Sequence, residues 1–169
     1  MAAAAQPNKE RLLLEAVKSL DTGVWTAFVT VVLAIMLGLH RSSPLSPLAL
    51  SALTASLLLQ LHGFYLLSRA DKRHVVGVIG AVLLLPGLLL NEVVMAAVGG
   101  YMLALGYTLL YREAREPRVR NAVLLAAAAT LLYPVLPGVA MLAVVLSLAY
   151  LSTGLHALRR RLWKGQAAP

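Results

Sequence analysis

The chain has 169 residues, of which 60% are hydrophobic and 13% charged, and its mean hydropathy is +0.79. A soluble domain carries about 45–50% apolar and about 25% charged residues, so this composition excludes a soluble fold and predicts an all-α, polytopic membrane protein. The absence of cysteine excludes disulfides and cysteine nucleophiles. A net charge of +8 would suggest nucleic acid for a soluble protein, but in a membrane protein basic residues collect on the cytoplasmic side, so we expect no nucleic-acid partner.

The first segment, residues 8–21, has the pattern of an amphipathic helix. Asn8 can cap its start, and Asp21-Thr22-Gly23 is expected to end it. Its apolar residues recur at helical spacing, at Leu13, Ala16, Val17 and Leu20. We therefore predict that residues 1–23 hold an N-terminal helix that lies flat in the membrane interface. A docking surface for a soluble partner is the alternative.

Six apolar segments follow, separated by polar or proline-containing turns, and they predict a six-helix transmembrane domain over residues 24–158. The predicted helices cover residues 24–39, 48–68, 75–90, 93–111, 121–133 and 139–158. The first, third and fifth are shorter than the about 20 residues that cross a bilayer. We expect them to extend into full spans, because lipid-embedded helices tolerate residues such as Pro86. The alternative is a re-entrant hairpin made by the third and fourth or by the fifth and sixth helices.

The basic residues predict the orientation of the spans. Fourteen of the 15 Lys and Arg residues lie in the N-terminal segment, in the turns after the second and fourth helices, or in a basic tail over residues 159–169. Only Arg41 falls on the other side. Because Lys and Arg in short loops mark the cytoplasmic face, we predict a multi-pass protein of the cell membrane with both termini in the cytoplasm. Losing one hairpin would leave four spans with the same orientation.

The second, fourth and sixth helices end in a similar way, which suggests an internal repeat. Their glycines stand at 63, 106 and 154, and an arginine follows six residues later in each case, at 69, 112 and 160. This pattern predicts three consecutive helical hairpins built from one repeated unit. The alternative is chance similarity between low-complexity helix ends.

Three histidines are the candidate cofactor ligands. His62, His74 and His156 are all expected near the cytoplasmic leaflet, and imidazoles from different helices can bind haem iron or a transition metal. The alternative is that they form hydrogen bonds with neighbouring carbonyls or with lipid headgroups. No buried carboxylate accompanies these histidines as a further ligand, so we predict no cofactor, and a haem or metal site is kept as the alternative.

The turn between the third and fourth helices holds a second candidate site. Asn91 and Glu92 could bind a cation, or Glu92 could pair with Arg41, which is expected on the same face. A polar turn at the water interface is the alternative. We find no carboxylate inside the predicted spans and no nucleophile-elbow, zinc-binding, phosphate-binding or dinucleotide motif, so no catalytic chemistry is evident.

The sequence therefore favours a non-enzymatic integral membrane protein that serves as an accessory or structural subunit. Its expected partners are the lipid bilayer and other membrane subunits or further copies of itself. A transporter or substrate-capture subunit is the first alternative. In size, six spans and inward termini the chain resembles, in topology only, the substrate-binding components of energy-coupling-factor vitamin importers, which implies a polar binding cavity. A haem-binding redox subunit and an enzyme acting on lipid are the remaining alternatives.

Overall fold

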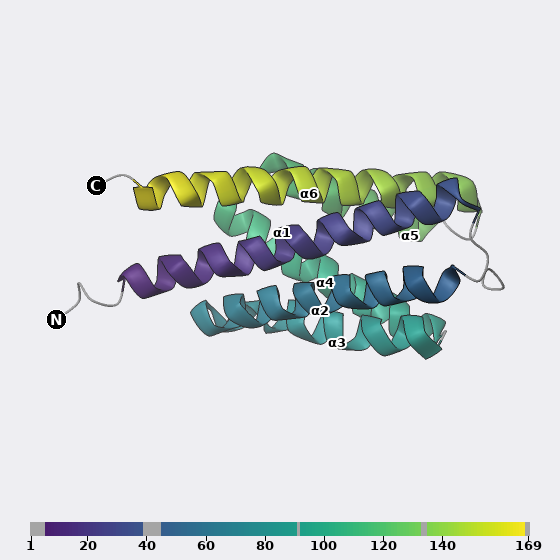
Figure 1. Ribbon diagram of the computed structural model, residues 1–169, viewed down its shortest axis with the longest axis horizontal. Helices are drawn as coiled ribbons and strands as arrows, with labels where there is room; N and C mark the ends of the chain where they lie inside the picture. Colours follow the sequence, from purple (N-terminus) through teal and green to yellow (C-terminus); the bar gives the residue numbers. More distant parts are fainter. Residues whose placement is uncertain (1–5, 39–44, 91, 133–134, 168–169) are drawn as a thin grey trace.

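The structure is a computed structural model that describes residues 6–38, 45–90, 92–132 and 135–167. Within these ranges the chain is all-helical and has no strand, as the composition predicts. The elements are α1 (Gln6–Met36), α2 (Ser46–Ala70), a short 3₁₀ helix η1 (Lys72–His74), α3 (Val75–Leu90), α4 (Val93–Ala114), α5 (Pro117–Leu132) and α6 (Pro137–Ala167), arranged as in Figure 1.

Four of these helices begin at a proline or one residue before it, and α1, which begins one residue before Pro7, is the first of them. Pro47 lies in the first turn of α2, Pro117 starts α5 and Pro137 starts α6. We expected these prolines in the connecting turns. They belong to the helices because a helix does not use the backbone N–H groups of its first turn, so proline loses no hydrogen bond there. Pro86 lies inside α3, and that helix continues to Leu90 as expected.

The predicted end of the first helix at Asp21-Thr22-Gly23 is wrong, because α1 continues without a break to Met36. The Thr22 hydroxyl donates to the carbonyl of Lys18 in its own helix, at 3.0 Å, and does not cap a new one. Gly23 faces the backbone of Ser56 in α2, so glycine is needed there for close helix contact rather than for a turn. The amphipathic segment is thus the first part of α1. Residues 159–167 of the basic tail are likewise helical, since they belong to α6.

Five helices are long and apolar enough to cross a membrane, in Glu10–Met36, Ser46–Ala70, Lys72–Leu90, Val94–Ala114 and Gly138–Trp163. The remaining helix, α5, has 16 residues. At about 1.5 Å per residue it is about 24 Å long, which is less than the about 30 Å of a bilayer's hydrocarbon core.

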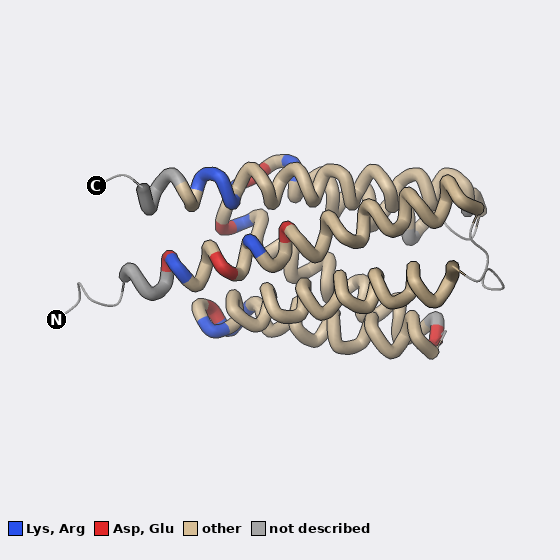
Figure 2. Tube along the Cα trace, viewed as in Figure 1, with Lys and Arg blue, Asp and Glu red and all other residues tan. Residues whose placement is uncertain are grey.

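The helices pack chiefly as three pairs of chain neighbours, α1 with α2, α3 with α4 and α5 with α6. The first pair is central, since α1 also packs on α6 and α2 on α3. Both termini lie at the same end of the bundle (Figure 1). Figure 2 shows that the described Lys and Arg residues gather at this end, which we call the basic end, whereas the spans beyond it are almost free of charge.

The buried core lies mainly toward the basic end. It includes Leu20, Phe64, Leu67 and Leu155, all nearly inaccessible to solvent. The three glycines of the suspected repeat also lie there, each against the first helix of its own pair. Gly63 contacts Leu20 of α1, Gly106 contacts Gly77 of α3, and Gly154 contacts Val119 of α5.

Candidate functional site

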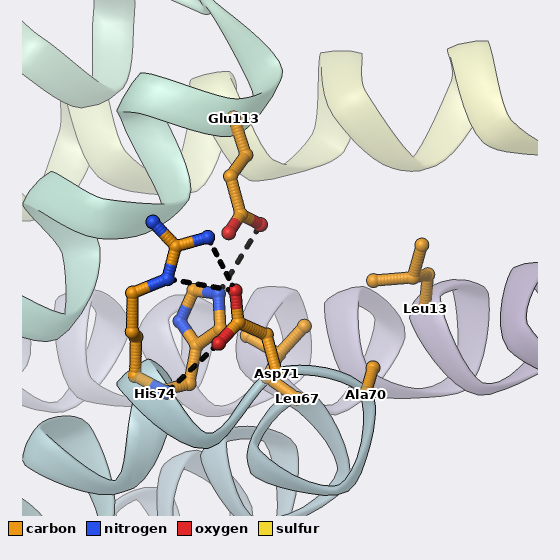
Figure 3. Close-up of a pocket in the computed structure, with 7 residues that line it drawn as sticks. Leu13, Leu67, Ala70, Asp71, His74 and Glu113 are labelled. Carbon is orange, nitrogen blue, oxygen red and sulfur yellow. Dashed lines mark hydrogen bonds and ion pairs between the residues drawn. The ribbon is translucent and has the colours of Figure 1, made fainter.

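A cavity of about 230 Å³ opens at the basic end, where four elements meet. Its polar walls come from Asp71, Arg73, His74 and Glu113, and its apolar walls from Leu13, Leu67 and Ala70. Figure 3 shows Glu113 reaching from the end of α4 toward the His74 ring, with Asp71 beside it. This is the one described place where a cavity, two carboxylates, a guanidinium and a buried imidazole come together.

The turn after α2 builds one wall of this cavity. The Asp71 backbone is extended and stops α2, and its carboxylate accepts a 2.9 Å hydrogen bond from the backbone N–H of Arg73. The Arg73 guanidinium returns to the same carboxylate, with Nη2 2.6 Å from Oδ2. The hydrogen bonds from the Arg73 side chain and from its backbone N–H together lower the pKa of Asp71 from 3.8 to about 2. The stabilisation by the ion pair between Asp71 and Arg73 is therefore fully present above the ordinary pKa of Asp71, and it is lost as the pH falls through about 2.

His74 is the buried polar group of the cavity, with 1% of its surface exposed. Its Nε2 lies 3.2 Å from Oε2 of Glu113, so the pair ties the start of α3 to the end of α4. Its Nδ1 is buried and has no hydrogen-bond partner among the described residues. In the neutral tautomer that carries its proton on Nε2, the imidazole donates to Glu113, and this contact fixes the orientation of the ring.

A second polar cluster joins α1 to α6. The Asp21 side chain is buried, and its Oδ2 lies 3.5 Å from Nδ1 of His156 and 3.4 Å from Nη1 of Arg159. Sequence reasoning missed this residue because it placed Asp21 at the end of a helix. The signal was present, since Asp21 stands four residues after Val17 and three before Val24, on the buried face of α1. A carboxylate on an apolar stripe indicates a partner on the facing helix.

A third cluster joins α5 to α6. Glu116 directly precedes α5 and is 3% exposed. Its Oε2 lies 2.9 Å from Nη2 of Arg161, with the geometry of an ion pair rather than a hydrogen bond, and its Oε1 lies 4.0 Å from Nε of Arg118. A carboxylate at a helix N-terminus also interacts favourably with the helix dipole. The cluster holds the short helix α5 against the basic end of α6.

Further from the basic end, three buried polar side chains form a chain of hydrogen bonds across α4, α2 and α1. The Tyr107 hydroxyl donates to Oε1 of Gln60 at 2.9 Å, and Gln60 Nε2 donates to the Ser56 hydroxyl at 3.2 Å. Ser56 donates in turn to the carbonyl of Gly23 at 2.8 Å. Each donor therefore has an acceptor on another residue, as buried polar groups require.

Tyr107→Phe is expected to lower the free energy of unfolding by about 1–2 kcal/mol, because it leaves Oε1 of Gln60 buried without a donor. The aromatic contact with Phe64, at a ring-centroid distance of 5.0 Å, is retained in this variant. Chemical denaturation in detergent micelles measures the change. Tyr101→Phe is the matched control, since Tyr101 is 68% exposed and is expected to have no effect. Equal stability of the two variants would show that the hydrogen-bond chain contributes nothing.

The structure places the three predicted histidines in three separate surroundings. His74 contacts Glu113 and His156 contacts Asp21, whereas His62 is exposed and lines a shallow groove of about 310 Å³ with Leu58, Leu61, Tyr65 and Val78. No group of three or more metal-ligating side chains occurs in the described ranges. Haem binding stays a prediction, which the presence or absence of a Soret band in the purified protein decides.

The predicted site at the opposite end is only partly described. Glu92 is exposed and precedes α4, with an extended backbone and no side-chain cap. Asn91 and Arg41 lie outside the described residues. Comparison with models of protein families, with curated proteins and with solved structures finds no match for this chain.

Proposed function

We propose that the protein crosses the cell membrane six times, with both termini and the basic end in the cytoplasm. Three observations support this topology. Five helices have the length and hydropathy of spans, both termini lie at one end of the bundle, and the described Lys and Arg residues gather there. The crossing that the five long helices do not account for is made by α5, which is short but packs along α6. A short span is accommodated by local thinning of the bilayer.

We further propose that three hairpins form a repeated unit. The support is the equivalent place of the three glycines, each of which lies against the first helix of its own pair. In each unit the second helix carries the glycine and then the arginine at the basic end. Small residues at such contacts let two lipid-embedded helices approach closely.

The function that this arrangement favours is that of a non-enzymatic structural or accessory subunit of a membrane complex. The observation that carries the proposal is that the buried polar groups contact other parts of the bundle. Asp21, Glu116 and His74 each contact an oppositely charged or hydrogen-bonding side chain, and each contact joins two elements of the bundle. These groups fix the relative positions of the helices, as expected of a rigid scaffold in the membrane.

Purification from native membranes tests the subunit proposal. The full-length protein, tagged at its C-terminus, is extracted in a mild detergent, chemically cross-linked and analysed by native electrophoresis and mass spectrometry. We expect a defined assembly with other membrane proteins or with further copies of the chain. If the protein migrates as a monomer while other complexes of the same membrane stay intact, the subunit proposal is wrong.

A small-molecule capture function is the second candidate, and the cavity beside His74 is the observation that favours it. Two carboxylates and one guanidinium line the cavity, so a small cationic amine is the ligand that suits its charge. A thermal-shift screen with such amines tests this candidate. Stabilisation of the wild type that Glu113→Gln abolishes would support it, and no stabilisation of the wild type would end it.

A further inference from the structure

The described arginines fall into two groups, those that contact a carboxylate and those that do not. Arg11, Arg73, Arg118, Arg159 and Arg161 each lie within ion-pair distance of an Asp or Glu. Arg69 and Arg160 are exposed and have no such contact in the described part of the chain. The same holds for Arg112, Arg115 and Arg120, which stand around the turn between α4 and α5. We call these three residues the α4–α5 arginine cluster. They form a concentration of positive charge that the protein itself leaves uncompensated.

All three residues stand within residues 112–120, around one turn of the backbone. Arg115 caps α4 in the left-handed conformation, with a φ of 50°, and its N–H donates to the carbonyl of Tyr111 at 2.7 Å. A non-glycine residue adopts this conformation at a cost in energy, and here it allows α5 to begin two residues later. Arg112 is in the last turn of α4, and Arg120 is in the first turn of α5. The cluster therefore surrounds a single tight corner.

The corner separates the paired from the unpaired arginines. The Cβ of Arg118 lies beside Gly154 of α6, and Arg118 belongs with Glu116 and Arg161 on that side. Arg120 follows two residues later, about 200° further around the helix, and so projects away from the contact with α6. The neighbouring carboxylate of Glu113 lies within 3.2 Å of His74 and faces the cavity. No described acidic side chain thus neutralises the arginine cluster.

Exposed apolar surface leads up to the cluster on both helices. On α4, Tyr101 and Leu105 are 68% and 38% exposed and lie at helical spacing below Arg112. On α5, Leu124 is 61% exposed and lies one turn beyond Arg120. Helices α4 and α5 pack less extensively than α2 and α3, the other consecutive pair whose connecting turn is described. Each helix thus presents exposed apolar side chains that lead to an arginine. This order matches that of an anionic phospholipid, whose apolar acyl chains lead to a charged phosphate.

The short length of α5 brings headgroups toward the arginines. If α5 crosses the bilayer with about 24 Å of helix, the bilayer thins around it, because the hydrocarbon core is normally about 30 Å thick, and thinning from the cytoplasmic side lowers that surface toward the basic end of α5. Lipid phosphates then lie at the level of Arg120. Guanidinium groups bind phosphate oxygens in pairs of parallel hydrogen bonds, which ammonium groups do not.

We infer that the α4–α5 corner is a binding site for an anionic phospholipid of the cytoplasmic leaflet. The phosphate lies among Arg112, Arg115 and Arg120, and the acyl chains lie along the apolar stripes of Tyr101 and Leu105 and of Leu124. The inference rests on the proposed topology, in which α5 crosses the bilayer from the cytoplasmic side. It adds a specific lipid partner and a reason for the uncompensated charge.

Native mass spectrometry of the full-length, detergent-purified protein tests this site. The protein is titrated with phosphatidylglycerol and, separately, with phosphatidylcholine. We compare the wild type with the triple variant R112Q/R115Q/R120Q and with the matched triple variant R69Q/K72Q/R160Q, which removes three exposed basic residues from other parts of the basic end. We expect the wild type and the matched variant to bind their first phosphatidylglycerol molecule with equal affinity. We expect the affinity of R112Q/R115Q/R120Q for this lipid to be lower by a factor of about 10 or more.

Three outcomes would overturn the inference. The first is equal loss of binding in both triple variants, which would indicate general surface charge. The second is unchanged binding in R112Q/R115Q/R120Q. The third is displacement of phosphatidylglycerol by millimolar inorganic phosphate, which would indicate a site for the free anion. If the triple variant does not fold, Arg115→Gly removes one charge and retains the left-handed turn, and it should still weaken binding.

Failure of the topology is recognised separately. The variant Arg120→Cys carries a single cysteine, and this cysteine should react with an impermeant maleimide only after the cells are lysed. Labelling in intact cells would refute the topology, whereas correct labelling together with unselective lipid binding would refute the lipid site alone.

Discussion

Gly99→Ala is expected to lower the free energy of unfolding by about 1–3 kcal/mol, the usual cost of adding a methyl group to a well-packed interior. A Cβ at this position would lie against the backbone of Leu84 and 2.9 Å from the carbonyl oxygen of Gly80, both in α3. Because these are backbone atoms, no side-chain rotation relieves the contact. The pair α3–α4 has to separate, and its extensive interface is lost in part.

Gly100→Ala is the matched control for this prediction. A Cβ at Gly100 would meet nothing within 4 Å. Since alanine favours a helix over glycine by up to about 1 kcal/mol, this variant is expected to be neutral or slightly stabilised. Unfolding by a denaturing detergent, followed by circular dichroism, measures both variants. If Gly99→Ala is as stable as Gly100→Ala, then α3 and α4 do not pack as described.

The second large effect is expected at Asp21. Replacing both His156 and Arg159 by alanine leaves the Asp21 carboxylate buried without its two partners from α6. Breaking a fully buried ion pair from one side costs about 3–5 kcal/mol. The cost here is expected to be lower, about 1–3 kcal/mol, because the side chains of His156 and Arg159 are 51% and 39% exposed. We therefore expect the double variant to unfold at markedly lower denaturant concentration than the wild type.

A third substitution separates this mechanism from loss of packing. Adding Asp21→Asn to H156A/R159A removes the buried charge and is expected to recover most of the lost stability. Arg11→Ala is the control for charge removal, because the pair Arg11–Glu15 is largely exposed and such pairs contribute about 0–1 kcal/mol. If Asp21→Asn gives no recovery, the carboxylate is not the source of the instability.

Hydropathy and turn residues predict most of the fold because a long, continuous apolar segment in lipid satisfies all of its own backbone hydrogen bonds only as a helix. The predicted bounds of α3 agree with the structure, and α2, α4 and α6 differ from prediction by extending further at one or both ends. The errors concern residues whose role depends on a neighbouring helix. Gly23 was interpreted as a helix end, although its place against α2 is what requires glycine.

The candidate site was less predictable, for the same physical reason. His74 and His156 were singled out as possible ligands from their type and depth, but their contacts with Glu113 and Asp21 join positions far apart in the sequence. Without homologous sequences, the chain carries no local signal for such pairs. The charge on the apolar stripe at Asp21 is the exception, and it indicates that a partner exists without indicating which residue it is.

The proposed topology depends most on α5 crossing the membrane, and labelling of single cysteines tests this crossing directly. The natural chain has no cysteine, so Val135→Cys, between α5 and α6, and Arg160→Cys, in α6, each provide a unique thiol. Glu92→Cys, between α3 and α4, is the reference for the outer face. In intact cells an impermeant maleimide is expected to label positions 92 and 135, and to label position 160 only after lysis. If position 135 is protected and position 160 is labelled from outside, the chain crosses five times and the proposed topology is wrong.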